Sequence, residues 1–186
     1  MTAKRTVAVL VGSLRKASLS RKVANAMIER APSTLDARLV EIGELPLYNE
    51  DLEANVPAPW ATFRAAIAAS DGALWVTPEY NRSIPGCLKN ALDVGTRPEK
   101  QNLFDGMPAA VASVTPYKLG GLAANLALRD AFVFPNLLVM QQPEAYVANA
   151  GELFDDAGKL KNDGTAKFFT KFMAAFAAWI EKLARS

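Results

Sequence analysis

Short, uniformly apolar runs alternate along the chain with longer segments in which apolar residues recur at helical spacing. Arg5–Val11 (RTVAVLV) is β-branched and apolar without alternation, which predicts a central parallel strand covered on both faces. Residues 72–76 (GALWV), 107–114 (MPAAVASV) and 137–140 (LLVM) predict further strands. Residues 37–42 (ARLVEI) alternate, which predicts a strand nearer the edge of the sheet.

Helical spacing appears between these strands, and the alternation of strand and helix predicts a doubly wound α/β domain. The expected helices follow the first strand and then cover residues 60–70, 88–94, 122–134 and 165–183. The last helix carries one broad apolar face, which we expect to pack against the sheet: Phe168, Phe169, Phe172, Met173, Phe176, Trp179, Ile180 and Leu183. Residues 44–59 form a long, proline-punctuated loop, and such loops are often functional.

Composition narrows the class of protein. With 186 residues, 51% of them hydrophobic, the chain suits one domain spanning residues 1–186. The 21 Lys and Arg residues against 19 Asp and Glu leave a net charge of +2, and no basic run indicates nucleic acid or an anionic membrane as a partner. No apolar run approaches the roughly 20 residues that span a bilayer.

The cysteine and histidine counts bear on location and chemistry. The single Cys87 excludes an intrachain disulfide, and no N-terminal charged and apolar signal precedes the first strand, so we expect a cytoplasmic protein. The chain has no histidine, which excludes Ser-His-Asp and Cys-His hydrolases and histidine zinc sites. Chemistry must therefore use carboxylates, hydroxyls, Lys, Tyr, Cys87 or a cofactor, and we expect no metal site.

The loop after the first strand, residues 12–21 (GSLRKASLSR), combines a turn glycine, three serines and three cations just before a helix. Helix N-termini favour anions, and hydroxyl and guanidinium groups add donors. Because neither G-x-x-x-x-G-K-[ST] nor G-x-G-x-x-G is present, the loop predicts a monophosphate site in preference to a triphosphate or a Rossmann dinucleotide site. A solvated loop in which Ser18 or Ser20 caps the helix is the alternative.

Two further strand ends carry polar loops. Residues 77–93 (TPEYNRSIPGCLKNALD) place hydrogen-bonding and aromatic groups between a buried strand and a helix, and residues 115–121 (TPYKLGG) place hydroxyls and glycines after the next strand. Ligands of open α/β sheets bind at the carboxyl ends of the strands, so a flat polar ligand would meet the chain here. An ordinary turn between strand and helix is the alternative.

Residues 77–93 match every fixed position of the PEYN-x-S-x-P-G-x-L-K-N-A-x-D signature of the NAD(P)H-dependent FMN reductase and quinone reductase family. Residues 12–21 resemble the same family's G-S-x-R-x-x-S loop, and the resemblance covers nearly the whole chain in element order. It implies a flavodoxin-like three-layer sandwich, with a five-stranded parallel sheet in the order 2-1-3-4-5 and helices on both faces.

The resemblance also implies an FMN site. In the family the first loop carries the 5′-phosphate, the Pro-Glu-Tyr-Asn loop runs along the isoalloxazine ring, and an S-x-G-x-x-G-G loop touches its pyrimidine end. The FMN-binding residues implied for this chain are Ser13, Arg15, Ser18, Ser20, Pro78, Glu79, Tyr80, Asn81, Thr115, Gly120 and Gly121.

Two positions depart from the family's pattern. Tyr117 replaces the middle glycine of the third loop, so we expect either backbone strain of about 1–2 kcal/mol or a local rearrangement. Ala123 stands where relatives often have an arginine that bridges subunits with a Pro-Glu glutamate, here Glu144. We hypothesise that Arg82 replaces that arginine by pairing with Glu144 across the interface.

Weaker candidates for contact with substrate, NAD(P)H or a second subunit are Tyr48, Arg82, Tyr117 and Glu144. In the family the long loop borders a neighbouring subunit's active site, which suggests Tyr48, although a solvated crossover is an equal alternative. Glu79 is either an acid or base or, more in keeping with such a loop, a carboxylate held by neighbouring amides. Cys87 is expected to be a buried small hydrophobe, and Asn90 to lie on a helix surface.

The function implied is transfer of two electrons from NADPH or NADH through FMN to a small-molecule acceptor, with ping-pong kinetics and the redox chemistry carried by FMN. The implied acceptors are quinones or, alternatively, free flavin, azo dyes, nitro compounds or chromate. A homodimer or homotetramer is expected. The alternatives are an electron-transfer flavodoxin, against which the net charge of +2 argues, and a non-enzymatic module on the same fold.

Overall fold

The computed structural model describes residues 4–184. Five strands lie side by side in the order β2-β1-β3-β4-β5, all parallel, and a sixth pairs with β4. This confirms the predicted order 2-1-3-4-5. The elements in chain order are β1 (Arg5–Val11), α1 (Leu19–Ile28), β2 (Leu35–Leu39), η1 (Glu50–Asn55), α2 (Ala58–Ala68), β3 (Gly72–Pro78), α3 (Gly86–Thr96), β4 (Pro108–Val114), α4 (Leu122–Ala131), β5 (Leu138–Val139), β6 (Ala145–Val147), η2 (Ala150–Glu152) and α5 (Asp163–Ala184).

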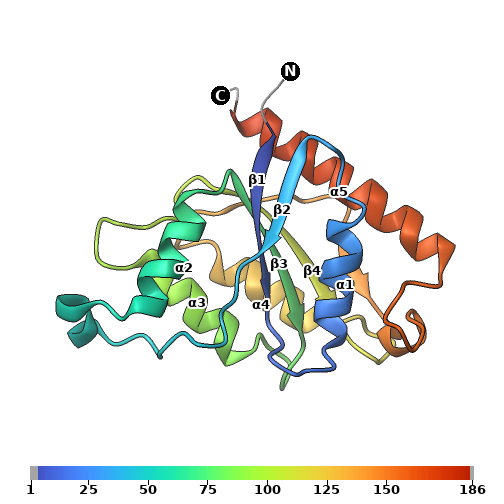
Figure 1. Ribbon diagram of the computed structural model, residues 1–186, viewed down its shortest axis with the longest axis horizontal. Helices are drawn as coiled ribbons and strands as arrows, with labels where there is room; N and C mark the ends of the chain where they lie inside the picture. The colour runs from blue at the N-terminus through green and yellow to red at the C-terminus, as the bar shows by residue number, and fades with distance from the viewer. Residues whose placement is uncertain (1–3, 185–186) are drawn as a thin grey trace.

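The helices form a layer on each face of the sheet. In Figure 1, α1 and α5 cover one face, and α2, α3 and α4 cover the other. Side chains of a strand point alternately to the two faces, so β1 serves both layers. Val7 and Val9 belong to the cluster under α1 and α5, whereas Ala8 and Leu10 belong to the cluster under α2 and α3. Burial on both faces explains why β1 lacks polar alternation.

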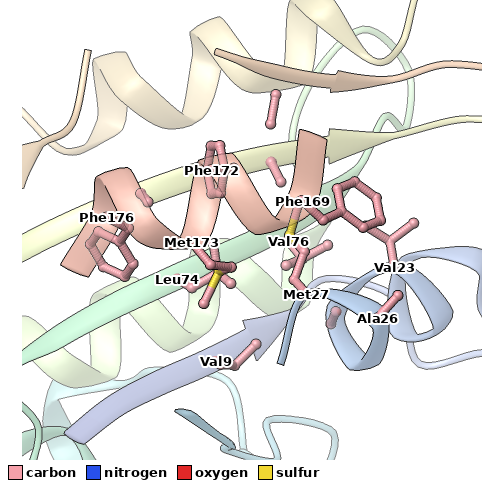
Figure 2. Packing of buried hydrophobic residues seen from close by; sticks show 14 of the residues in the cluster. Val9, Val23, Ala26, Met27, Leu74, Val76, Phe169, Phe172, Met173 and Phe176 are labelled. Carbon is pink, nitrogen blue, oxygen red and sulfur yellow. The ribbon is translucent and has the colours of Figure 1, made fainter. Parts of the chain in front are cut away.

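The aromatic face of α5 fills the core on the first side. Phe172 and Phe176 are 1% and 0% exposed, and Figure 2 shows Met173 of the same helix next to Leu74 of the sheet. The indole N–H of Trp179 donates to the carbonyl of Leu138 over 2.7 Å, which fixes the helix to the short β5. The predicted packing face is therefore confirmed.

Several predicted boundaries were wrong. The second strand covers Leu35–Leu39 and not residues 37–42, because its register pairs Arg5 of β1 with Leu35 and Val9 with Leu39. The helix predicted for residues 122–134 ends at Ala131. The sequence reading also missed β6, a strand of three residues, and η1, which lies inside the long loop.

None of the helices in residues 4–184 is long and apolar enough to cross a membrane.

Candidate functional site

A cavity of about 520 Å³ lies at the carboxyl edge of the sheet, where the loops after β1, β3 and β4 meet. This edge is the lower one in Figure 1. Because β1 and β3 are neighbours whose connections leave in opposite directions, the cavity lies at the topological switch point of the sheet. Of the residues implied for FMN, all but Ser18 and Gly120 line it: Ser13, Arg15, Ser20, Pro78, Glu79, Tyr80, Asn81, Thr115 and Gly121.

One end of the cavity is rich in donors without partners. Ser13 and Ser20 are mostly buried as residues, at 6% and 2% exposed, but their hydroxyl oxygens, which have no hydrogen-bond partner in the described part of the chain, remain accessible from the cavity. The backbone N–H groups of Leu19 and Ser20, at the first two positions of α1, also lack an acceptor within residues 4–184, as expected at a helix N-terminus. Arg15 is exposed at the same end and has no carboxylate partner there. These groups suit a phosphate monoester.

Ser18 has a different role from its neighbours. It is the N-cap of α1, and its hydroxyl accepts a hydrogen bond from the N–H of Arg21 over 3.0 Å. The alternative reading of this loop, a capping serine, therefore holds for Ser18 and not for Ser20.

Gly12 allows the first loop to pass close to α3. A Cβ atom at this position would lie 2.5 Å from Cδ1 of Leu88 and 3.0 Å from Cδ of Pro78. Gly12 also donates from its N–H to the carbonyl of Val76 over 2.9 Å, which continues the pairing of β1 with β3 into the loop. A side chain at this position would therefore push the first loop away from Leu88 and Pro78.

The second loop is a tight two-residue hairpin. The N–H groups of Tyr80 and Ser83 each donate to the other residue's carbonyl over 3.0 Å, with Asn81 and Arg82 at the turn. Their φ angles of 51° and 64° define a type I′ turn, which suits asparagine but costs an arginine about 1–2 kcal/mol. The turn places Tyr80, which is 45% exposed, on the rim of the cavity.

Glu79 connects the second loop to the third. Its Oε2 accepts hydrogen bonds from the N–H groups of Ala123 and Ala124, over 3.0 and 3.3 Å, at the start of α4. The N-cap residue of that helix, Gly121, has no side chain, so the carboxylate caps it from another loop. Oε1 lies 3.3 Å from Nη1 of Arg82. The carboxylate is thus held by amides, as expected in preference to acid or base chemistry.

In the third loop, the glycine pair supplies the unusual backbone angles. Gly120 and Gly121 have φ angles of 62° and 75°. Tyr117 has no positive φ angle, so the backbone strain considered for this position is absent. Gly120 does not line the cavity; its carbonyl accepts from the buried hydroxyl of Ser113 over 2.7 Å. The N–H of Tyr117 donates to Oγ1 of Thr115 over 3.2 Å, and Tyr117 is 75% exposed at the rim of the cavity.

The four weaker candidates for contact with substrate, NAD(P)H or a second subunit lie in different places. Arg82 and Tyr117 line the cavity, whereas Tyr48 and Glu144 do not. The carboxylate of Glu144 accepts from the hydroxyl of Tyr146 over 2.7 Å, and Arg82 pairs with Glu79. Pairing of Arg82 with Glu144 between subunits therefore stays a hypothesis.

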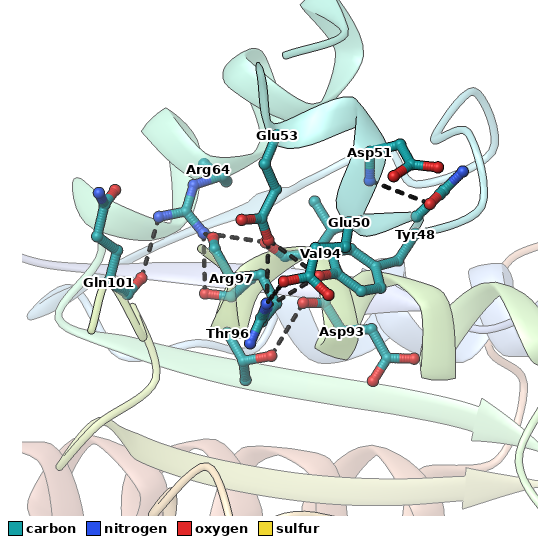
Figure 3. Close-up of polar contacts among 12 residues, drawn as sticks. Tyr48, Glu50, Asp51, Glu53, Arg64, Asp93, Val94, Thr96, Arg97 and Gln101 are labelled. Carbon is teal, nitrogen blue, oxygen red and sulfur yellow. Dashed lines mark hydrogen bonds and ion pairs between the residues drawn. The ribbon is translucent and has the colours of Figure 1, made fainter. Parts of the chain in front are cut away.

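Tyr48 belongs to a separate polar cluster that holds the long loop against the end of α3 (Figure 3). We name Tyr48, Glu50, Glu53, Arg64 and Arg97 the Tyr48 cluster. The hydroxyl of Tyr48 donates to Glu53 and accepts from Nε of Arg97, each over 2.9 Å. Burial, followed by the hydrogen bond to Glu53, raises the pKa of Tyr48.

Arg64 completes that cluster from α2. It donates to four backbone carbonyls that follow or end α3: Val94 over 2.9 Å, Gly95 over 3.2 Å, Gln101 over 3.0 Å, and Arg97. A cation at a helix C-terminus complements both the free carbonyls and the dipole.

Asn90 and Cys87 lie behind the cavity. The prediction that Asn90 lies on the helix surface was wrong: it is 6% exposed, accepts from the N–H of Tyr48 over 2.8 Å and donates to the carbonyls of Leu45 and Pro46. Cys87 is half-buried, and burial raises the pKa of its thiol, which donates to the carbonyl of Gly12 over 3.4 Å. Both side chains hold loops in place.

Comparison with known proteins yields one family and several close relatives. Residues 5–152 match the model of the NADPH-dependent FMN reductase family. The chain is 55% identical over 177 residues to a quinone reductase of Pseudomonas putida, with 95% of each chain covered. It is 39% identical to a 2-hydroxy-1,4-benzoquinone reductase of a Burkholderia species, over 94% of this chain and 95% of that one.

Among solved structures, the fold superposes with a TM-score of 0.90 on FerB, a flavoenzyme NAD(P)H:(acceptor) oxidoreductase from Paracoccus denitrificans. The two sequences are 42% identical, and the match covers 96% of this chain and 98% of that one.

Proposed function

The chain belongs to the NADPH-dependent FMN reductase family, and from that premise we propose that it passes two electrons from NAD(P)H through FMN to quinones in a ping-pong cycle. The family makes it an NAD(P)H-dependent oxidoreductase with FMN as its cofactor and a small molecule as its acceptor. The ping-pong order and the residues of the FMN site are parts of the proposal, as is one FMN-binding domain over residues 1–186.

One observation carries the proposal: three loops that resemble flavin-binding motifs line a single cavity. Its donor set fits the cofactor at both ends. The hydroxyls of Ser13 and Ser20, which have no partner in the described part of the chain and face the cavity, suit a phosphate monoester together with Arg15. At the other end, the N–H groups of Glu79 and Asn81 have no acceptor within residues 4–184, and they suit the polar edge of a flat heterocycle.

Bound there, FMN would supply the redox chemistry, namely hydride uptake from NAD(P)H and delivery of two electrons to the acceptor. The residues of the chain bind and orient it. Glu79 keeps the second loop fixed on α4, so its carboxylate is not free to act as an acid or base. The exposed rings of Tyr80 and Tyr117 border the open side of the cavity, where donor and acceptor would bind in turn.

Quinones are the acceptor class that we propose, supported by the names of the two relatives. Free flavin, azo dyes, nitro compounds and chromate are alternative acceptors for the same open side. A cytoplasmic location is also part of the proposal, supported by a chain whose single cysteine carries no disulfide.

A homodimer, or a tetramer of dimers, completes the proposal. Large apolar side chains lie exposed along α4 and just after it, including Leu126 at 51% and Phe134 at 95%. A second copy would remove them from water. Light scattering coupled to size exclusion measures the mass, and a monomer would contradict this part.

The two half-reactions test the catalytic proposal. We expect purified protein to bind FMN, to lose its flavin absorbance on anaerobic addition of NADPH, and to regain it on addition of a benzoquinone. Steady-state rates should give parallel double-reciprocal plots. Bound FMN that NADPH cannot bleach would favour an electron-transfer flavodoxin, and protein that binds no FMN would favour a non-enzymatic module.

A further inference from the structure

A second pocket, of about 440 Å³, lies beside the first loop on the flank of α1. Residues of α1 and of the turn that precedes α5 line it, and both segments lie on the right of Figure 1. Its polar lining consists mainly of Lys16, Ser18, Arg21, Lys22, Asn25 and Lys159. We name these six residues the basic pocket.

The positive charge of the basic pocket is largely uncompensated. Among the charged residues that line it, four are cations and one, Glu29, is a carboxylate, which lies 3.4 Å from Arg30. Arg21 forms two hydrogen bonds with Glu41, which raise its pKa and lower that of Glu41. No carboxylate within residues 4–184 lies within 4.0 Å of the ammonium groups of the three lysines.

Two of these lysines come from separate segments. Lys22 is half-buried on α1, and its ammonium group lies 5.9 Å from the ring centroid of Phe154. Lys159 lies in the turn before α5, where Asp155 holds the backbone: the N–H of Lys159 donates to Oδ1 of Asp155 over 2.8 Å. Like charges brought together in a concave surface without counter-charges raise the local concentration of anions.

The basic pocket adjoins the phosphate end of the FMN cavity. Arg15 lines the cavity and Lys16 lines the basic pocket, whereas Ser18 lines the basic pocket and Leu19 lines the cavity. Consecutive Cα atoms are about 3.8 Å apart, so the two hollows lie on opposite sides of one stretch of backbone. A ligand longer than FMN could lie in both.

We propose that the basic pocket binds the 2′-phosphate of NADPH and so makes NADPH the preferred donor over NADH. The inference rests on the proposed function, because it places the nicotinamide on the open side of the FMN cavity. A dinucleotide that runs from there towards the first loop brings its adenosine half to Lys16. NADPH differs from NADH by one phosphate monoester, and lysines bind such groups as point charges.

Donor kinetics of a double variant, Lys22→Gln with Lys159→Gln, test the proposal. Since each exposed charge changes binding by a few-fold, we expect KM for NADPH to rise roughly tenfold. The value of kcat with either donor, and KM for NADH, should stay at the wild-type level. Lys161→Gln is the matched control, because it removes the same charge two residues further along, outside the basic pocket.

Binding measured by calorimetry on the FMN-loaded protein separates this inference from the proposed function. We expect 2′,5′-ADP to bind more tightly than 5′-AMP, with a difference that shrinks at high salt and disappears in the double variant. Equal binding of 2′,5′-ADP by the double variant and the wild type would overturn the inference. So would equal losses for NADPH and NADH, or a loss in Lys161→Gln as large as in the double variant. A wild type that reduces no quinone contradicts the proposed function alone.

Discussion

The end of the cavity that carries Ser13, Arg15 and Ser20, where we propose that the phosphate of FMN binds, differs from the Tyr48 cluster in how its polar groups are paired. In the Tyr48 cluster the hydroxyl of Tyr48 makes two hydrogen bonds, and Arg64 makes four. In the cavity the hydroxyls of Ser13 and Ser20 have no partner in the described part of the chain.

This difference separates structural from functional polar groups. Buried polar groups are nearly always hydrogen-bonded, because leaving one unpaired costs about 1–3 kcal/mol. The hydroxyls of Ser13 and Ser20 avoid that cost because they face the cavity, where water or a ligand can pair with them. The Tyr48 cluster, by contrast, is complete without one, and it holds the long loop in place.

The largest expected effect comes from removing the unpaired donors of the cavity. Arg15→Met combined with Ser20→Ala should raise the dissociation constant of FMN roughly a hundredfold, because a charge-assisted and a neutral hydrogen bond to phosphate are lost. The free energy of unfolding of the apoprotein should change by less than about 0.5 kcal/mol, since these groups have no partners to lose. Flavin fluorescence quenching and urea denaturation measure the two quantities.

Riboflavin, which lacks the phosphate, is the control ligand for this double variant. It should bind to the variant and to the wild type equally well. A loss of riboflavin affinity as large as the loss of FMN affinity would show that the loop had changed shape, and the comparison between the two regions would fail.

Arg64→Met tests the Tyr48 cluster in the opposite direction. The carbonyls at the end of α3 would lose a charged donor, so the free energy of unfolding should fall by about 2 kcal/mol. FMN affinity should stay unchanged, because Arg64 lies outside the cavity. Arg64→Lys keeps the charge but lacks the planar guanidinium, so its free energy of unfolding should lie between those of the wild type and Arg64→Met. A hundredfold loss of FMN affinity in Arg64→Met would show that the Tyr48 cluster also determines FMN binding.

Glu79 sharpens the comparison, because it lies in the cavity and yet has partners. Glu79→Ala should lower the free energy of unfolding by about 1 kcal/mol, since α4 loses its cap. FMN affinity should fall as well, because the second loop loses its tie to the third. Glu79→Gln keeps an acceptor oxygen, so it should lose less stability and less FMN affinity than Glu79→Ala. If the two variants lose FMN affinity to the same extent, the charge matters more than the cap.

Much of the site could be predicted because its motifs follow strands directly. A strand end, a turn residue and a helix start are local features, and they place Ser13, Arg15 and Asn81 at one edge of the sheet. The sequence could not show that Ser18 caps α1 and Ser20 does not, because this depends on which residue begins the helix. Two further polar residues, Asn90 and Glu79, have partners that are distant in the sequence.

Asn90 and Glu79 illustrate those contacts. An amide in a helix suggests a surface position, but Asn90 is buried by a loop more than forty residues earlier. Glu79 caps a helix 44 residues later, which no local pattern indicates. In the same way, the register between β1 and β2 decided the boundaries of β2, and the alternation of residues 37–42 did not.

The smallest expected effect is a change in how stability depends on pH. Burial and Glu53 raise the pKa of Tyr48 above that of the unfolded chain. Its contribution to stability is therefore fully present below the unfolded pKa of about 10 and is lost as the pH rises through the folded pKa. In Tyr48→Phe this contribution is absent. The variant should be less stable than the wild type at neutral pH, and the gap should narrow above about pH 10.

Urea denaturation of both proteins across this range measures the gap, and FMN titrations at the same pH values provide the comparison with the cavity. A gap that stays constant with pH would mean that the proton of Tyr48 is not held by the fold. A gap that narrows while FMN affinity stays equal in the two proteins would show that the Tyr48 cluster stabilises the long loop without reaching the cavity. The two regions would then be energetically separate although both loops contact α3.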